Sequence, residues 1–154
     1  MRFLDQWQKV VHARNVEKGF YDYTKDIAQF KQFVERMVAT GQTPAGNDGK
    51  MTNNEFWAVV RIVNDYERAM IERKMLLIIG ELCEAHEELR TGHAPDEVYT
   101  NGDSPKPEGY GIEMADAEIR LLDLVASLGL DLETLMERKH AYNGTRPYKH
   151  GRQF

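Results

Sequence analysis

Apolar residues recur at three- and four-residue steps through most of the chain, a spacing that is typical of amphipathic helices. The pattern predicts helices over residues 2–14, 24–39 and 112–128. A further helix is expected from Asp131, which can cap its first turn, to Asn143. Helices should therefore make up most of the fold.

The segment between residues 52 and 92 predicts one much longer helix. Thr52 and Glu55, in the sequence TNNE, form a capping box, which marks a helix start. The helical pattern continues to Arg90, and Gly92 can end it. Such a length is unusual in a globular protein, so two shorter helices with a break within 66–71 are the alternative.

Two segments rich in loop-forming residues, 41–51 and 91–110, separate these helices. No segment alternates between polar and apolar residues over the length of a strand, so no β-hairpin is predicted. The expectation is a single all-α domain over residues 1–154, built as a bundle of four or five helices.

Charge is unevenly distributed in a chain of otherwise ordinary composition. Hydrophobic residues make up 42% of it and the net charge is −5. Residues 138–154 hold five Lys or Arg and no acid, which leaves 15 basic and 25 acidic side chains elsewhere. An acidic body argues against a nucleic-acid polymer as partner. The basic C-terminal segment indicates either a small bound polyanion or an ordinary solvated terminus.

Neither a membrane nor a disulfide is expected. The longest aliphatic run, Met75–Ile79, is too short to cross a bilayer, and the N-terminal residues lack the apolar stretch of a signal peptide. The single cysteine, Cys83, excludes an internal disulfide, and we expect it to pack as a small buried side chain. The interpretation is a cytoplasmic protein without a membrane partner.

Two of the predicted helices carry a pair of carboxylates three residues apart, beside the apolar stripe of the helix. Glu81 and Glu84 lie on one helix, and Glu113 and Asp116 lie on the next. Residues three apart are neighbours on a helix surface, so each pair can reach one point. The stripes, which we expect to form the core, comprise Met75, Ile78, Leu82, Ala85 and Leu89 on the first helix, and Met114, Leu121, Val125 and Leu128 on the second.

Four carboxylates that meet between two helices repel each other unless some take up protons or a cation joins them. Mg²⁺ prefers carboxylate oxygens and commonly shares its coordination shell with phosphates. The pattern therefore indicates a metal site, with a solvated acidic helix face as the alternative. A di-iron bundle needs two Glu-x-x-His motifs, and only Glu137 with His140 supplies one.

The sequence around these acids resembles the MazG-like branch of the all-α nucleoside triphosphate pyrophosphohydrolases. The resemblance lies in GELCEAHEELR and in KPEGYGIEMADAEIRLLDL, which contain the family pattern of E-x-x-E, a spacer and E-x-x-D. Here 28 residues separate Glu84 from Glu113. Residues 72–154, including the tail KHAYNGTRPYKHGRQF, resemble the family well, and residues 8–23 do so loosely through VEKGFYD. Residues 24–60 have no counterpart and are interpreted as an insertion.

The resemblance implies a homodimer or larger homo-oligomer in which the four acids hold Mg²⁺, with Mn²⁺ as a substitute. It implies cleavage of a nucleoside triphosphate or deoxynucleoside triphosphate to the monophosphate and pyrophosphate. It also implies that Lys139, Asn143 and Arg146 contact the phosphates or the nucleotide. Our hypothesis for the base that takes the proton of the attacking water is Glu81 or Glu84.

Two alternatives remain open on the sequence. One is a related hydrolase of a specialised nucleotide, and the other is a non-catalytic helical module that binds a nucleotide or a protein. Asp123 is interpreted either as a further acid near the metal or as an ion-pair partner, for example of Arg120. Three aromatic residues either stack on a base or pack in the core: Phe20, Tyr21 and Tyr142.

Overall fold

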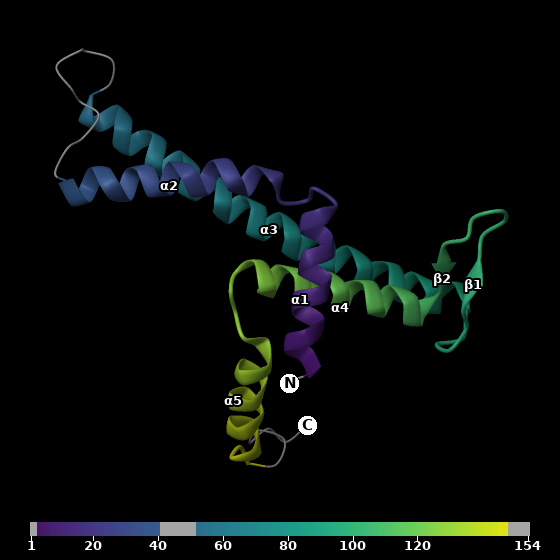
Figure 1. Ribbon diagram of the computed structural model, residues 1–154. Coiled ribbons are helices and arrows are strands. Elements are labelled where there is room, and N and C mark those ends of the chain that lie inside the picture. Colours follow the sequence, from purple (N-terminus) through teal and green to yellow (C-terminus); the bar gives the residue numbers. More distant parts are fainter. Residues whose placement is uncertain (1–2, 41–51, 148–154) are drawn as a thin grey trace.

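The computed structural model of the protein describes residues 3–40 and 52–147. It contains five helices and one small antiparallel sheet (Figure 1), which confirms the predicted all-α class. In chain order the elements are α1 (Phe3–Glu17), α2 (Asp22–Thr40), α3 (Asn53–Thr91), β1 (Tyr99–Thr100), β2 (Pro107–Glu108), α4 (Tyr110–Ser127) and α5 (Leu132–Gly144). None of the helices described combines the length and apolar character that a bilayer span requires.

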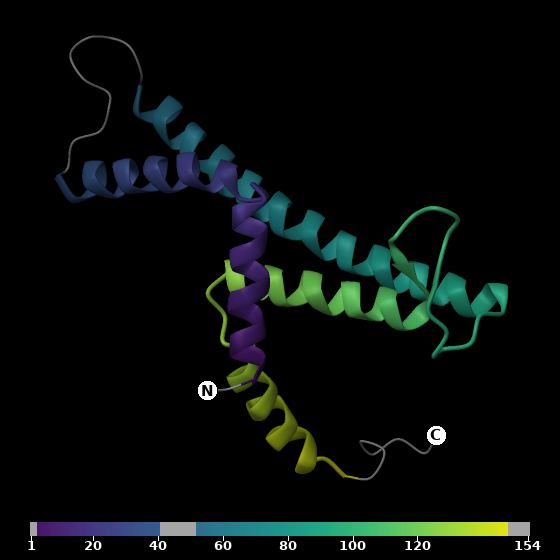
Figure 2. The same ribbon diagram turned by 45° about the vertical axis from the view of Figure 1, so that its right-hand side comes forward.

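The α3 and α4 helices lie side by side and antiparallel, and α1 crosses this pair (Figures 1 and 2). The α2 helix runs along the N-terminal half of α3, where Phe33 contacts Phe56 and Lys31 forms an ion pair with Glu67. This part of the molecule, α2 with the N-terminal half of α3, extends beyond the region where α3 and α4 pack together (Figure 1). It contains the described residues of the proposed insertion, 24–60, whose residues 41–51, expected as a loop, lie outside the described structure.

The long helix α3 is continuous, so the alternative with a break within 66–71 is wrong. No glycine or proline, the two residues that most disfavour a helix interior, interrupts residues 53–79. The predicted capping box is confirmed, because the Thr52 hydroxyl accepts from the backbone N–H of Glu55 and the Glu55 carboxylate accepts from that of Thr52. Gly92, in the left-handed region at φ +98°, ends the helix.

The core lies where α1, α3 and α4 meet. Its buried apolar side chains in this region are Val11, Ala85, Ala117, Leu122, Leu124 and Val125. Gln8 is buried as well, and its side-chain N–H donates to the carbonyl oxygen of Leu130 at 2.9 Å. This bond ties α1 to the turn that follows α4. The buried polar set also contains Glu81, Glu113 and Asp123, so acidic groups take part in the core itself.

The apolar stripe expected to bury α3 is only partly buried. Ala85 is covered, but Met75, Leu82 and Leu89 are 52%, 44% and 42% exposed. The helix spacing was correct, whereas the contact face was not, because α4 packs against the flank of α3 that carries Glu81. The acids therefore lie within the helix–helix contact rather than beside it.

The stripe expected on α4 shows the same displacement. Val125 is buried, but Met114 and Leu128 are 41% and 42% exposed. Because Glu113 and Ala117 are the buried residues of its first turns, α4 turns its acidic flank toward α3. The expectation for Cys83 is also wrong, since this side chain is exposed.

The connection between α3 and α4 contains two strands of two residues that the sequence did not predict. Tyr99 pairs with Glu108 across them. Gly109 follows directly at φ +126°, and a Cβ atom there would lie 2.3 Å from the carbonyl oxygen of Glu97. Only glycine fits this position, and it starts α4 at Tyr110, one turn ahead of the first acid of that helix.

Candidate metal centre

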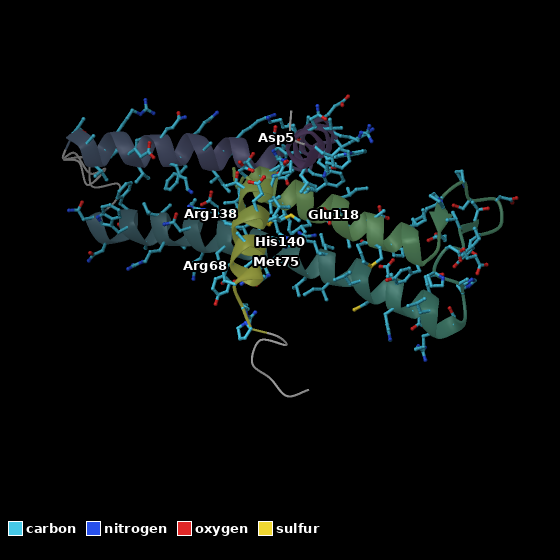
Figure 3. All side chains as sticks on the ribbon, turned by 90° about the horizontal axis from the view of Figure 1, so that it is seen from below. Asp5, Arg68, Met75, Glu118, Arg138 and His140 are labelled. Atoms are coloured by element: carbon cyan, nitrogen blue, oxygen red, sulfur yellow. The ribbon has the colours of Figure 1, made fainter. Side chains whose placement is uncertain are left out.

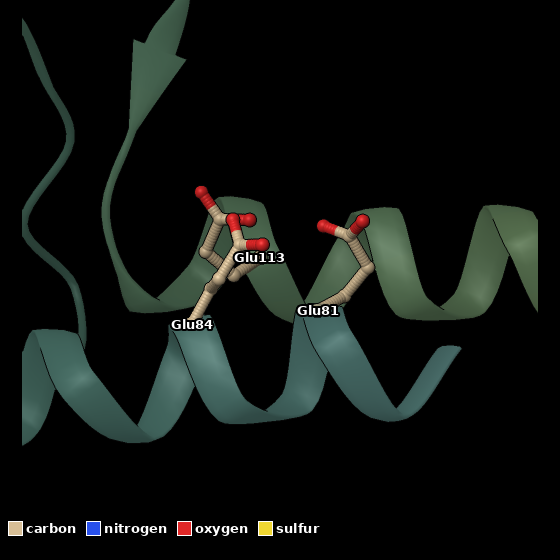
Figure 4. A group of neighbouring side chains, drawn as sticks. All are labelled: Glu81, Glu84 and Glu113. Atoms are coloured by element: carbon tan, nitrogen blue, oxygen red, sulfur yellow. The ribbon is translucent and has the colours of Figure 1, made fainter. Parts of the chain in front are cut away.

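Three of the four predicted acids converge between α3 and α4. Glu81 and Glu84 lie one turn apart on α3, and Glu113 lies in the first turn of α4 (Figure 4). One carboxylate oxygen of each lies within 4.8 Å of those of the other two. The antiparallel packing of the two helices thus brings together acids that are 29 or more positions apart in the chain.

The two inner carboxylates of this acidic cluster are shielded from water. Glu113 is 2% exposed and Glu81 is 7% exposed, whereas Glu84 lies open at the edge. The buried Oε2 atom of Glu113 has no hydrogen-bond partner among the described residues. Burying a carboxylate oxygen without a hydrogen-bond partner destabilises the fold by about 1–3 kcal/mol, and by more when the group is charged. A cation in the cluster would relieve this cost.

The acid–base state of Glu113 reflects the same crowding. Burial, together with the neighbouring carboxylates of Glu81 and Glu84, raises its pKa to about 7, although the ammonium of Lys106 acts in the opposite direction. Without a cation, Glu113 therefore holds a proton for much of the time near neutral pH. A divalent ion would compete with that proton for the same oxygens.

The fourth predicted acid, Asp116, does not belong to this cluster. It is half-buried and lines an adjoining cleft between α3 and α4. Arg120, one turn later on α4, also lines the cleft, and its Nε atom lies 2.6 Å from Oε1 of Glu81. Of the four predicted metal ligands, the structure thus brings three glutamates together, with an aspartate and an arginine alongside, and metal binding stays a prediction.

Asp123 belongs to a separate polar network at the crossing of α1, α3 and α4. It is 5% exposed. Its Oδ2 atom accepts hydrogen bonds from the Tyr21 hydroxyl at 2.7 Å and from Lys74 Nζ at 3.0 Å, and Oδ1 lies 2.9 Å from His12 Nδ1. Among the open interpretations the ion pair is the one observed, with Lys74 as the cation. Lys74 lies on the same flank of α3 as the acids, which is the only sequence signal for this pair.

Asp123 stays ionised in this network. Burial alone would raise its pKa, but the hydrogen bonds from His12, Tyr21 and Lys74 outweigh that effect and hold the pKa below its ordinary value. The network consumes all four groups in bonds to one another. It therefore serves to join helices rather than to present a free acid to a metal.

The predicted substrate ligands lie apart from the acidic cluster. Lys139 and Asn143 are on α5 and Arg146 follows it, and all three are exposed. The α5 helix leaves the α3/α4 layer and packs against the start of α1 (Figures 1 and 2). Seen from below, it stands in front of that layer (Figure 3). A single chain thus does not bring these residues to the carboxylates.

The aromatic candidates divide between core and surface. Tyr21 is buried in the Asp123 network, which assigns it to the core. Phe20 is 65% exposed at the mouth of the cleft that Asp116 lines. Tyr142 is exposed on α5 beside Lys139, whose Nζ lies 5.2 Å from the ring centre.

Comparison of the chain with protein-family models, with curated proteins and with solved structures gave no significant match. The residues of the acidic cluster and their geometry are therefore the basis on which its function is inferred.

Proposed function

We propose that this protein is a Mg²⁺-dependent nucleoside triphosphate pyrophosphohydrolase of the MazG-like, all-α type, acting in the cytoplasm. The observation that carries the proposal is the convergence of Glu81, Glu84 and Glu113, one of which has a buried oxygen without a hydrogen-bond donor among the described residues. Oxygen-only ligand sets of this kind suit hard divalent cations. The proposed substrate is an NTP or dNTP, and the products are a nucleoside monophosphate and pyrophosphate.

The acids have distinct tasks in this proposal. Glu81, Glu84 and Glu113 would hold Mg²⁺ or Mn²⁺, with Asp116 reached from the cleft side. The metal supplies charge neutralisation for the phosphates and polarises a water molecule. The side chains themselves cannot bind a triphosphate, because like charges repel. A cleft of about 460 Å³, lined by Asp116 and by the Arg120 that pairs with Glu81, offers room for a ligand next to the cluster.

Glu84 is the better of the two candidate bases. Glu81 is already paired with Arg120, whereas Glu84 is exposed and accepts no hydrogen bond from the described residues. In the proposed step the water oxygen bonds to the α-phosphorus, and the bond from that phosphorus to the α–β bridging oxygen breaks. The water proton passes to Glu84, and pyrophosphate leaves.

We further propose that the active form is a homodimer or larger homo-oligomer. The support is an exposed stripe on α3 formed by four apolar residues, Met75, Ile79, Leu82 and Leu89, with His86 between the last two. Their alternating spacing of four and three residues matches the seam of paired helices, and the stripe is about 21 Å long at 1.5 Å per residue. A two-fold axis would set such a stripe against itself in a second copy.

A second copy would also give α5 a role. None of its thirteen residues, all of which the structure describes, is buried, so packing within one chain contributes little to its stability. Lys139, Asn143 and Arg146 remain proposed ligands of the phosphates, now for the site of the neighbouring copy.

The proposal is tested with a panel of the eight common NTPs and dNTPs in the presence of Mg²⁺. Pyrophosphate release is expected from at least one nucleotide. Glu84→Gln and Asp116→Asn should lower kcat about a hundredfold or more. Glu118→Gln, at an exposed position on the same helix as Asp116, should leave kcat unchanged. Circular dichroism checks that each variant stays helical.

The alternatives give different results in the same assay. A non-catalytic module would bind Mg²⁺ or nucleotide by calorimetry without releasing pyrophosphate. A hydrolase of a specialised nucleotide would release it only from substrates outside the panel, with the same sensitivity to Glu84→Gln. Absence of both metal binding and turnover would contradict the proposed function.

A further inference from the structure

The cleft beside the acidic cluster has a basic wall. It is enclosed by α3, α4 and the α1–α2 turn, and its lining includes Phe20, Arg73, Lys74, Asp116, Ile119 and Arg120. Lys74 is already bonded to Asp123 and Tyr21. The other positive charges of this lining are those of Arg73 and Arg120.

Arg120 links this cleft to the acidic cluster. Its Nε atom lies 2.6 Å from Oε1 of Glu81, whose side chain is 9% exposed. The Arg120 side chain itself is 43% exposed and lines the cleft, while its guanidinium contacts the buried Glu81 carboxylate. Three acids converge here, and this guanidinium supplies the cation that pairs with one of them in the absence of metal.

We infer that Arg120 is a substrate-positioning residue that exchanges partners when the site is loaded. It holds Glu81 while no divalent cation is bound. When the cation takes over the Glu81 carboxylate, the guanidinium is released into the cleft, where it binds a phosphate group of the substrate. This inference rests on the proposed function for the identity of the substrate, but the partner exchange itself does not require turnover.

The exchange follows from the chemistry of the three groups. A carboxylate oxygen that ligates a divalent ion has less charge to offer a guanidinium. The planar guanidinium matches phosphate as well as it matches carboxylate, with two parallel hydrogen bonds. Asp116, four residues before Arg120 on the same face of α4, would be near enough to pair with the released side chain and to hold it between the metal site and the cleft.

The decisive experiment measures two affinities of the full-length protein, each by calorimetry. The first is for Mn²⁺ alone, and the second is for inorganic tripolyphosphate at saturating Mg²⁺, which reports phosphate binding without a base. Arg120→Gln should bind Mn²⁺ roughly three- to tenfold more tightly, because the competing cation is gone, and should bind tripolyphosphate about tenfold more weakly. These opposite changes would not arise from general loss of structure.

Two further variants sharpen the result. Arg120→Lys keeps the charge but loses the planar fork, so its Mn²⁺ affinity should stay near that of the wild type while tripolyphosphate binding weakens. Arg73→Gln, on the opposite wall of the cleft, should leave Mn²⁺ affinity unchanged. The inference would be overturned if Arg120→Gln bound Mn²⁺ as tightly as wild type or more weakly. It would also be overturned if tripolyphosphate did not bind, or if Arg120→Gln did not change its affinity.

The outcome is separable from that of the proposed function. Opposite shifts in the two affinities without pyrophosphate release from any nucleotide would uphold the exchange and remove the enzyme. Turnover of a nucleotide by the wild type, together with unchanged affinities in Arg120→Gln, would uphold the enzyme and contradict the exchange.

Discussion

The Tyr21 hydroxyl donates a hydrogen bond of 2.7 Å to the carboxylate of Asp123, 102 positions later in the chain. The ammonium of Lys74 bonds to the same carboxylate oxygen and lies 4.0 Å from the centre of the Tyr21 ring. His12 completes the group from α1. Four segments of the chain are thus joined at one buried carboxylate, on the same helix pair that carries the acidic cluster.

Removing the charge of Asp123 should destabilise the fold. Asp123→Asn leaves the half-buried Lys74 without its ion-pair partner, and the expected loss in the free energy of unfolding is about 3 kcal/mol. Urea denaturation at pH 7 measures it. Glu118→Gln, exposed on the same helix, should stay within about 0.5 kcal/mol of wild type. A similar small effect for Asp123→Asn would show that the network adds little.

The same carboxylate should contribute to unfolding in acid. Because the folded pKa of Asp123 is lower than its ordinary value of 3.8, its contribution to stability is present above that value. It is lost as the pH falls below 3.8 and through the folded pKa. Stability curves of wild type and Asp123→Asn should therefore converge in acid, and a constant gap between them down to the lowest pH would contradict this assignment.

In the metal-free protein, Glu113 should make the stability depend on pH in the opposite direction to Asp123. Its folded pKa of about 7 is higher than the ordinary 4.5, so its favourable contribution is complete below 4.5 and is lost as the pH rises toward 7. Glu113→Gln cannot ionise, and it should be more stable than wild type by about 1–3 kcal/mol at pH 8 in EDTA, with little difference at pH 5.

Bound metal should make wild type the more stable of these two proteins. Saturating Mn²⁺ at pH 8 should stabilise wild type and have little effect on Glu113→Gln, because the variant lacks one of the ligands. Thermal melts with and without Mn²⁺ provide the measurement. Equal stabilisation of both proteins would remove Glu113 from the metal site.

The α3 stripe makes a prediction about assembly. Leu82 lies at its centre and is 44% exposed, so Leu82→Glu would place a charge in a helix–helix interface and should weaken self-association about a hundredfold or more. Leu76→Glu is the matched control, since Leu76 is 67% exposed and lies off the stripe. Sedimentation velocity at micromolar concentration distinguishes the species, and a monomeric wild type would contradict the proposed dimer.

Two glycines should respond to alanine in opposite ways. At Gly109 a Cβ atom would meet the Glu97 carbonyl at 2.3 Å, so Gly109→Ala should destabilise the protein by about 1–3 kcal/mol and weaken Mn²⁺ binding by shifting the first turn of α4. At Gly80, inside α3, nothing lies within 4 Å of such an atom. Gly80→Ala should stabilise the helix by up to about 1 kcal/mol. Chemical denaturation decides both, and equal effects would contradict the role assigned to Gly109.

The local signals in the chain were sufficient for the helices and their ends. The Thr52 capping box, the Asp131 cap and the glycine at 92 depend on interactions within one or two helical turns, which a sequence contains in full. The acidic pairs on α3 and α4 could be recognised for the same reason. Helix spacing places Glu81 beside Glu84 whatever the rest of the chain does.

Tertiary structure alone decided which face of each helix became buried. The apolar spacing pointed to a stripe in which only Ala85 became buried, whereas Met75, Leu82 and Leu89 stay exposed and the flank with Glu81 is covered instead. A helix with apolar residues over much of its circumference offers several contact faces, and the choice depends on the partner helix, the connection with Gly109 and the crossing of α1. The pairing of Asp123 with Tyr21, and of Glu81 with Arg120, follows from that choice, because long-range contacts depend on how helices pack and not on spacing within any one of them.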